Sequence, residues 1–195
     1  MADTYKNFAA LRRWEHEGKD YRVRFVNRSA DVTIIAPHGG KIERGSSEVA
    51  HAIAGRDHNF CAFEGIRDED NSDLHITSTN FDEPICLDLV KRAKGVVAVH
   101  GLKGDEAETR VGGRDKNLRS EIRDALNDAG FDAEIEDGGP YGGSAPNNIC
   151  NRGRTHAGVQ LELTKAQRDA LLDDDDDMAA YARAVRKAIA RVFED

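Results

Sequence analysis

The sequence predicts an α/β fold: a single domain over residues 1–195, with a mixed, mainly parallel sheet and helices on both faces. Residues 32–36 and 95–100 form continuous apolar runs rich in β-branched side chains. Such runs are typical of strands that are buried on both faces of a parallel sheet. Segments with helical spacing alternate with the strand-like runs, and neither a linker nor an internal repeat interrupts the alternation.

Shorter segments complete the predicted sheet. Residues 21–26 alternate between apolar and polar side chains, as a half-exposed strand does. Apolar and β-branched composition predicts further strands at 59–63, 74–77, 131–135 and 159–163.

Helices are predicted between these strands. The helix at 46–54 has Ser46 or Ser47 as its cap and Gly55 as its stop. Further helices are expected at 85–93, at 114–129 and in the tail from about 165 to 195. The acidic run at 173–177 interrupts this tail, and we interpret it as a helix break because neighbouring carboxylates repel one another and do not converge on one ion.

Composition limits the classes of function. The net charge of −8 argues against nucleic-acid binding, which depends on neutralising phosphates with Lys and Arg. No apolar run is long enough to cross a bilayer, and the first residues lack the layout of a secretion signal, so we expect synthesis in the cytoplasm and no membrane partner. We also expect a monomer. An anionic substrate would need a local basic pocket, since the overall charge repels it.

The three cysteines are far apart in sequence and form no CxxC pair, which argues against a thiolate zinc site. We interpret Cys61 and Cys86 as small buried apolar residues. Cys150 lies in a polar loop rich in Gly and Asn, where a buried side chain and a reactive thiol are both open.

Two histidines end predicted buried strands. His38 follows the strand at 32–36 and precedes Gly39 and Gly40, while His100 ends the strand at 95–100. In open α/β sheets, ligands bind beyond the carboxyl ends of the strands. Glu43 is five positions after His38, so the three side chains would supply the usual number of protein ligands to a catalytic zinc ion, Zn²⁺. Alternatively, the histidines form hydrogen bonds within the core and Glu43 is a surface residue.

Zinc-dependent hydrolysis also needs a general base and groups that bind the substrate. Glu162 lies among apolar residues in the last predicted strand and is the predicted base, although an outward-facing position on an edge strand remains open. The predicted substrate-binding residues are Arg152, Arg67, His75 and Asn151. Arginine binds carboxylates through two hydrogen bonds, but both arginines could instead be ordinary surface charges. No GxSxG, Walker A or HExxH motif is present.

Several blocks together resemble the phage poly-γ-glutamate hydrolase family. They are Ala36-Pro37-His38-Gly39-Gly40-Lys41-Ile42-Glu43-Arg44-Gly45-Ser46-Ser47-Glu48, Leu74-His75-Ile76-Thr77-Ser78-Thr79-Asn80-Phe81-Asp82, Val99-His100-Gly101, Asn148-Ile149-Cys150-Asn151-Arg152 and Gly158-Val159-Gln160-Leu161-Glu162-Leu163. The resemblance implies a zinc peptidase with a carboxypeptidase-like fold that cleaves γ-glutamyl amide bonds of an anionic capsule polymer, poly-γ-glutamate. It implies His38, Glu43 and His100 as zinc ligands and Glu162 as the base. Arg152 would match a substrate-carboxylate arginine.

Two alternatives remain open. The same zinc site could serve an amidase or carboxypeptidase that acts on other peptides, or the protein could be a non-catalytic phage accessory protein. A polyanionic substrate requires basic residues near the site, and the candidates are Lys103, Arg110, Arg114, Arg152 and Arg154. Release outside the cell through lysis of a host would leave no mark in the sequence.

Overall fold

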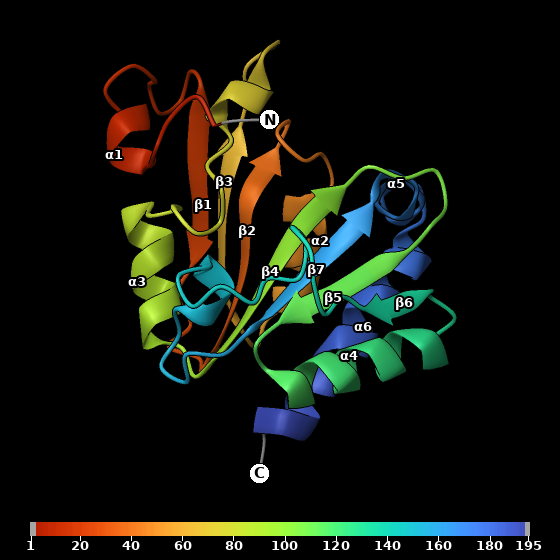
Figure 1. Ribbon diagram of the computed structural model, residues 1–195. Helices are drawn as coiled ribbons and strands as arrows, with labels where there is room; N and C mark the ends of the chain where they lie inside the picture. The colour runs from red at the N-terminus through yellow and green to blue at the C-terminus, as the bar shows by residue number, and fades with distance from the viewer. Residues whose placement is uncertain (1–2, 194–195) are drawn as a thin grey trace.

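The computed structural model describes residues 3–193 and arranges them around one seven-stranded sheet (Figure 1). The strands are β1 (Tyr21–Val26), β2 (Val32–Gly40), β3 (Asn59–Gly65), β4 (Gly95–Leu102), β5 (Thr109–Gly113), β6 (Ala133–Ile135) and β7 (Val159–Thr164). Their order across the sheet is β1-β3-β2-β4-β7-β5-β6. The β2–β3, β2–β4, β4–β7 and β5–β6 pairs are parallel, whereas β1–β3 and β5–β7 are antiparallel. The predicted fold class is confirmed.

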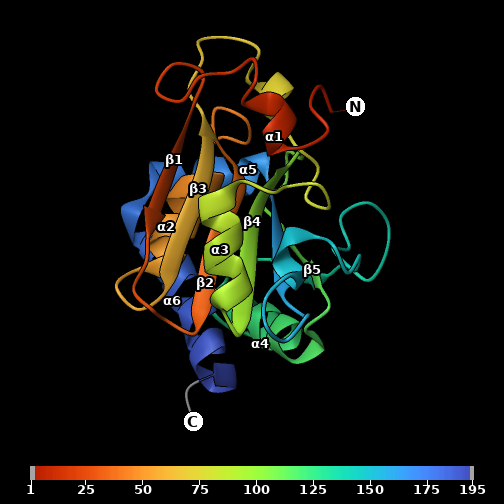
Figure 2. The same cartoon turned by 90° about the vertical axis from the view of Figure 1, so that its left-hand side faces the viewer.

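Helices cover both faces of the sheet, as Figure 2 shows. One face carries α2 (Ser46–Ala54), α4 (Lys116–Asp128), α5 (Lys165–Asp173) and α6 (Asp175–Phe193), which share an apolar cluster with the sheet. The other carries α1 (Phe8–Leu11), α3 (Pro84–Arg92) and the short 3-10 helix η2 (Ile149–Asn151), which share a second cluster. A further 3-10 helix, η1, spans Asn71–Leu74. Among residues 3–193, no helix combines the length and the apolar character needed to cross a membrane.

The central strands are buried along nearly their whole length, as the apolar runs predict. The arrowheads of β2, β4 and β7 point to the same edge of the sheet (Figure 1), because these three neighbours run parallel. Residues near the ends of these strands therefore lie close together in space. His38 and His100 are an example, although they are 62 positions apart in sequence.

Two predictions about strands are wrong. Residues 74–77 form no strand: η1 ends at Leu74, and Leu74 and Ile76 are buried by loop packing instead of a ladder. Conversely, no strand is predicted at 109–113, yet these residues form β5, which ends at Gly112 and Gly113 and pairs with β7. An added Cβ at Gly113, where φ is +107°, would lie 2.1 Å from the Gly158 carbonyl oxygen, so this close pairing requires glycine.

The tail consists of two helices within the described residues; residues 194 and 195 of the predicted tail, like residues 1 and 2 of the predicted domain, lie outside them. Helix α5 ends at Asp173 and α6 begins at Asp175. The Asp174 carboxylate accepts hydrogen bonds from the N–H groups of Asp176 and Asp177, which is the capping that an aspartate provides at a helix start.

The interpretation of Cys61 and Cys86 as separate apolar residues is wrong. Both are buried, but they form a disulfide that joins β3 to α3, with Cα atoms 5.5 Å apart. Sequence spacing could not reveal this pair, because the two residues meet only through the packing of α3 on the sheet.

Candidate metal centre

His38 lies at an irregularity near the end of β2. The pairing of β2 with β3 shifts between Ala36 and Gly39, and the following turn returns the Glu43 N–H to the His38 carbonyl at 2.9 Å. An added Cβ at Gly40, where φ is +63°, would lie 2.5 Å from the Gly65 carbonyl oxygen. Glycine at this position lets β2 stay close to β3 while the chain turns, and the turn brings Glu43 back to His38.

Three side chains converge where β2 and β4 end. The Nδ1 atoms of His38 and His100 are 3.2 Å apart. Glu43 Oε1 is 3.1 Å from His38 Nδ1, and its Oε2 is 3.7 Å from His100 Nδ1. Both imidazoles are buried, so these atoms form a compact set of nitrogen and oxygen donors that is shielded from bulk water.

Each of the three side chains also forms a hydrogen bond with the surrounding protein. His38 Nε2 donates to the Ile76 carbonyl at 2.8 Å, and His100 Nε2 is 3.4 Å from Ser78 Oγ. Glu43 Oε2 accepts from the Gly101 N–H at 2.8 Å. A hydrogen bond from Nε2 to a carbonyl leaves Nδ1 of His38 as the nitrogen with a free lone pair, which is the tautomer that a metal ligand requires.

The donor set fits zinc. Bonds of about 2.0–2.1 Å in a tetrahedral arrangement place ligand atoms about 3.3 Å apart. The three separations in this centre, 3.1, 3.2 and 3.7 Å, are close to that value. Three nitrogen and oxygen ligands leave one position of a tetrahedron for water or substrate.

Charge–charge interactions also favour a bound cation. Burial alone raises the pKa of Glu43, but the imidazoles of His38 and His100 outweigh it and hold this pKa far below its usual range. Glu43 therefore stays ionised at neutral pH and contributes a full negative charge to the centre.

His75 also contacts the centre. The centroids of the His75 and His38 rings are 4.0 Å apart, and His75 Nδ1 is 2.8 Å from Asp3 Oδ1. His38, Glu43 and His75 each offer one atom within 4.8 Å of one another, so His75 is a further candidate ligand. It lies on the loop after η1, and not on the strand that the sequence predicts.

Glu162 lies beside His100 on the neighbouring strand β7, where the two residues are register partners. The strand is internal to the sheet, and the Glu162 side chain is buried and not exposed at an edge. Burial raises the pKa of Glu162, and the nearby Glu43 raises it further. Gln160 Nε2 donates to Glu162 Oε1 at 2.7 Å, so Oε2 is the oxygen that is left to exchange a proton.

These groups line a cleft of about 750 Å³. The lining includes uncharged residues of the loop between β6 and η2, among them Pro140, Tyr141 and Ser144. It also includes the basic residues Arg44, Lys103, Lys165 and Arg168. Candidate histidine ligands, a buried carboxylate and a cleft of this size are the features expected of a site that binds and hydrolyses a substrate.

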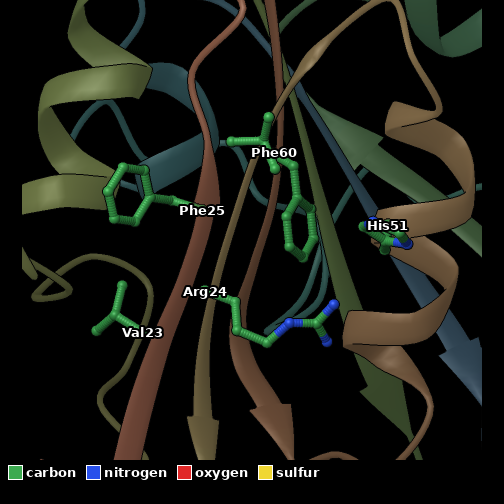
Figure 3. Close-up of a pocket in the computed structure, with 6 residues that line it drawn as sticks. Val23, Arg24, Phe25, His51 and Phe60 are labelled. Carbon is green, nitrogen blue, oxygen red and sulfur yellow. The ribbon is translucent and has the colours of Figure 1, made fainter.

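Two other groupings do not match this chemistry. The pocket of about 320 Å³ between β1 and α2 is shown in Figure 3; it holds His51, Arg24 and apolar side chains, with no carboxylate in its lining. Cys61, Glu83 and Cys86 also lie within ligand distance of one another. Their sulfur atoms are joined in the disulfide, so no thiolate is available to a metal.

Three of the residues that the sequence suggests for substrate binding are outside the cleft lining, and their role in substrate binding stays a prediction. Arg152 donates to the Phe81 carbonyl at 2.7 Å, and Arg67 forms ion pairs with Glu15 and Asp20. The Asn151 amide donates to the Gly143 and Ala145 carbonyls and fixes the long loop. Their polar surroundings reflect loop packing, which residue type and spacing alone do not distinguish from substrate binding.

The predicted basic surface is also different from the observed one. Of its five residues, only Lys103 lines the cleft, while Arg110 pairs with Glu108 and Glu136. Arg44, Lys165 and Arg168 were missed by sequence reasoning. The position of Arg44 directly after Glu43 is a signal that could have identified it.

Comparisons with known proteins agree with this architecture. The profile of the family described as Poly-gamma-glutamate hydrolase matches residues 5–193. The UPF0714 protein YmaC of Bacillus subtilis (strain 168) is 40% identical over 174 residues, which cover 88% of this chain and 73% of YmaC. A bacteriophage poly-gamma-glutamate hydrolase structure superposes with a TM-score of 0.93 at 32% identity, covering 98% of this chain and 99% of the other. The structure of zinc-free YndL superposes with a TM-score of 0.92 at 30% identity, covering 98% of this chain and 100% of the other.

Proposed function

The chain belongs to the poly-gamma-glutamate hydrolase family, and from this premise we propose that it is a zinc-dependent hydrolase of γ-glutamyl amide bonds in poly-γ-glutamate. The observation that carries the proposal is the convergence of His38, Glu43 and His100, with donor atoms 3.1–3.7 Å apart, beside the buried Glu162. This convergence supplies a metal site and a general base in one cleft.

His38 and His100 would hold zinc through Nδ1, and Glu43 through its carboxylate. When bound, zinc supplies Lewis acidity, which lowers the pKa of a water molecule and polarises the carbonyl to be cleaved. The Ile76 carbonyl and Ser78 hydroxyl hold the far nitrogens of the two rings, and the Gly101 N–H holds Glu43. These contacts fix the direction of each donor before a substrate arrives.

Glu162 is the residue that we assign to proton transfer. Its Oε2 would take a proton from the attacking water and return it to the nitrogen of the leaving amine. Its raised pKa suits this role, since a carboxylate whose pKa is closer to neutral takes a proton from water more readily, and its acid form can still protonate an amine. Gln160 orients the carboxylate through Oε1, and His75 lines the same cleft, where it can contact the substrate.

The proposal is tested by hydrolysis of γ-linked and α-linked glutamate polymers. We expect the wild type to shorten the γ-linked polymer, and Glu162→Gln to lose roughly 10²- to 10⁴-fold in kcat while retaining zinc. Glu134→Gln is the matched control, because Glu134 is exposed on β6 and does not line the cleft. Equal cleavage of the α-linked polymer would reject the substrate, and near-wild-type activity of Glu162→Gln would reject the base.

A further inference from the structure

The basic residues of the cleft come from three elements that are distant in sequence. Arg44 lies in the turn after β2, Lys103 follows β4, and Lys165 and Arg168 belong to α5. All four line the cleft that contains the candidate metal centre. The same lining contains the uncharged Pro140, Tyr141 and Ser144 and the acidic Asp3, Glu43, Glu162 and Asp169, so cations are half of the charged residues of the cleft in a protein whose net charge is −8.

Arg168 is the fixed member of this group. Its side chain is buried, and it donates to the carbonyls of Leu163 at 3.2 Å and Leu102 at 3.1 Å, and to that of Arg44. All three partners are neutral, and within residues 3–193 Arg168 has no carboxylate ion-pair partner, although Glu43, Asp169 and Glu162 act on it at longer range. A buried guanidinium without a direct counterion retains its attraction for an anion.

Arg168 also lies next to the metal centre. A Cβ added at Gly101 would be 2.6 Å from Arg168 Cζ and 2.9 Å from Glu43 Cβ. The same Gly101 donates its N–H to Glu43. The fixed positive charge is therefore adjacent to the position where the scissile amide would bind.

Arg44 and Lys103 add two further cations to the cleft lining. Both side chains are exposed, and in the described part of the chain neither forms an ion pair. Lys165 pairs with Asp169, which also lines the cleft and partly offsets the local charge. Two unpaired exposed cations and a buried one that line the same cleft provide several positions for carboxylates of one chain.

The chemistry of the substrate matches this arrangement. In a γ-linked glutamate polymer, every residue has a free α-carboxylate on the carbon that bears the amide nitrogen. An internal α-linked bond has no carboxylate at that carbon. A cation beside the metal centre therefore meets a carboxylate beside the scissile nitrogen only in γ-linked chains or at a free C-terminus.

We propose that Arg44, Lys103, Lys165 and Arg168 form the subsites for the α-carboxylates of the polymer, and that Arg168 binds the one beside the scissile amide. This inference rests on the proposed function and adds the residues that select γ-linked over internal α-linked bonds. The polymer then lies along the ends of β4 and β7, between the basic residues and the uncharged loop.

The test compares Arg44→Gln/Lys103→Gln with Arg183→Gln/Lys187→Gln, which removes the same charge from exposed positions on α6 outside the cleft. Kinetics are measured on γ-linked polyglutamate and on its α-methyl ester, over a range of salt concentrations. We expect the cleft variant to raise KM for the charged polymer roughly fivefold to tenfold, with kcat changed less than about twofold and a weaker salt dependence. On the ester, both variants should match the wild type.

The outcomes separate the two proposals. Cleavage of the charged polymer by the wild type, with the cleft variant behaving as the α6 variant does, overturns the carboxylate subsites and leaves the proposed function intact. An equal rise in KM on the ester also overturns them, since the effect would not depend on charge. Failure of the wild type to cleave either polymer overturns both the function and the inference.

Discussion

At the scale of single residues, each ring of the candidate centre has one nitrogen directed to the centre and the other directed to the protein. His38 uses Nε2 for the Ile76 carbonyl, and His100 uses Nε2 for Ser78. Both partners belong to the loop after η1, so this loop orients both rings, and its Ile76 carbonyl leaves Nδ1 of His38 as the nitrogen that can bind a metal. Substitutions in that loop should therefore affect metal affinity without removing a ligand.

Cys150 gives a prediction that is independent of any metal. The thiol is buried, and burial raises its pKa to about 12. At pH 8 the native thiol is then protonated, and the protonated form is not the nucleophile. Iodoacetamide at pH 8 should leave Cys150 unmodified in the native protein and alkylate it after denaturation, as mass spectrometry of the peptide will show. Rapid labelling of the native protein would contradict this assignment and restore the reactive-thiol interpretation.

The sequence is informative about the centre because strand ends are recognisable. His38 and His100 follow apolar runs that can be only buried strands or buried helix segments, and the geometry of parallel sheets then brings strand ends together. Arg152, Arg67 and Asn151 could not be assigned in this way. Their partners are carbonyls and carboxylates from distant segments, which only the folded chain brings within reach.

At the scale of secondary-structure elements, the strand that is not predicted from the sequence is β5, which has little apolar character. Strand β5 contains Arg110 and two glycines, and it is identified by its pairing with β7 and not by its composition. The segment at 74–77 shows the reverse case. It is apolar enough to be predicted as a strand, yet its buried residues Leu74 and Ile76 lie outside any strand. Apolar pattern reports burial more directly than it reports backbone pairing.

The Cys61–Cys86 disulfide makes a prediction at this scale. It closes a loop with a sequence separation of 25, and a closed loop of that length stabilises a fold by about 3 kcal/mol. Urea denaturation should show that dithiothreitol lowers the free energy of unfolding of the wild type by about this amount.

The double variant Cys61→Ala/Cys86→Ala is the control for the disulfide prediction. It lacks the disulfide, so the same reductant should leave its unfolding curve unchanged. A wild-type curve that does not respond to the reductant would contradict the contribution of the disulfide.

At the scale of the whole molecule, the sheet order explains how one site can draw on most of the chain. Strands β2, β4 and β7 are neighbours and run parallel, so their ends supply His38, His100 and Glu162 to one edge. Helix α5 follows β7 directly and brings Arg168 to the same edge. The net charge is −8, while Arg44, Lys103, Lys165 and Arg168 give the cleft local positive charge.

The central claim is that His38, Glu43 and His100 bind zinc, and metal analysis of the dialysed protein tests it most directly. We expect about one zinc ion per chain in the wild type, in His75→Ala and in the exposed control His51→Ala, but little in His100→Ala. Removal of zinc by a chelator should lower the Tm, and re-addition should restore it. A wild type that binds no stoichiometric zinc, or an His100→Ala variant that binds as much as the wild type, would contradict the account.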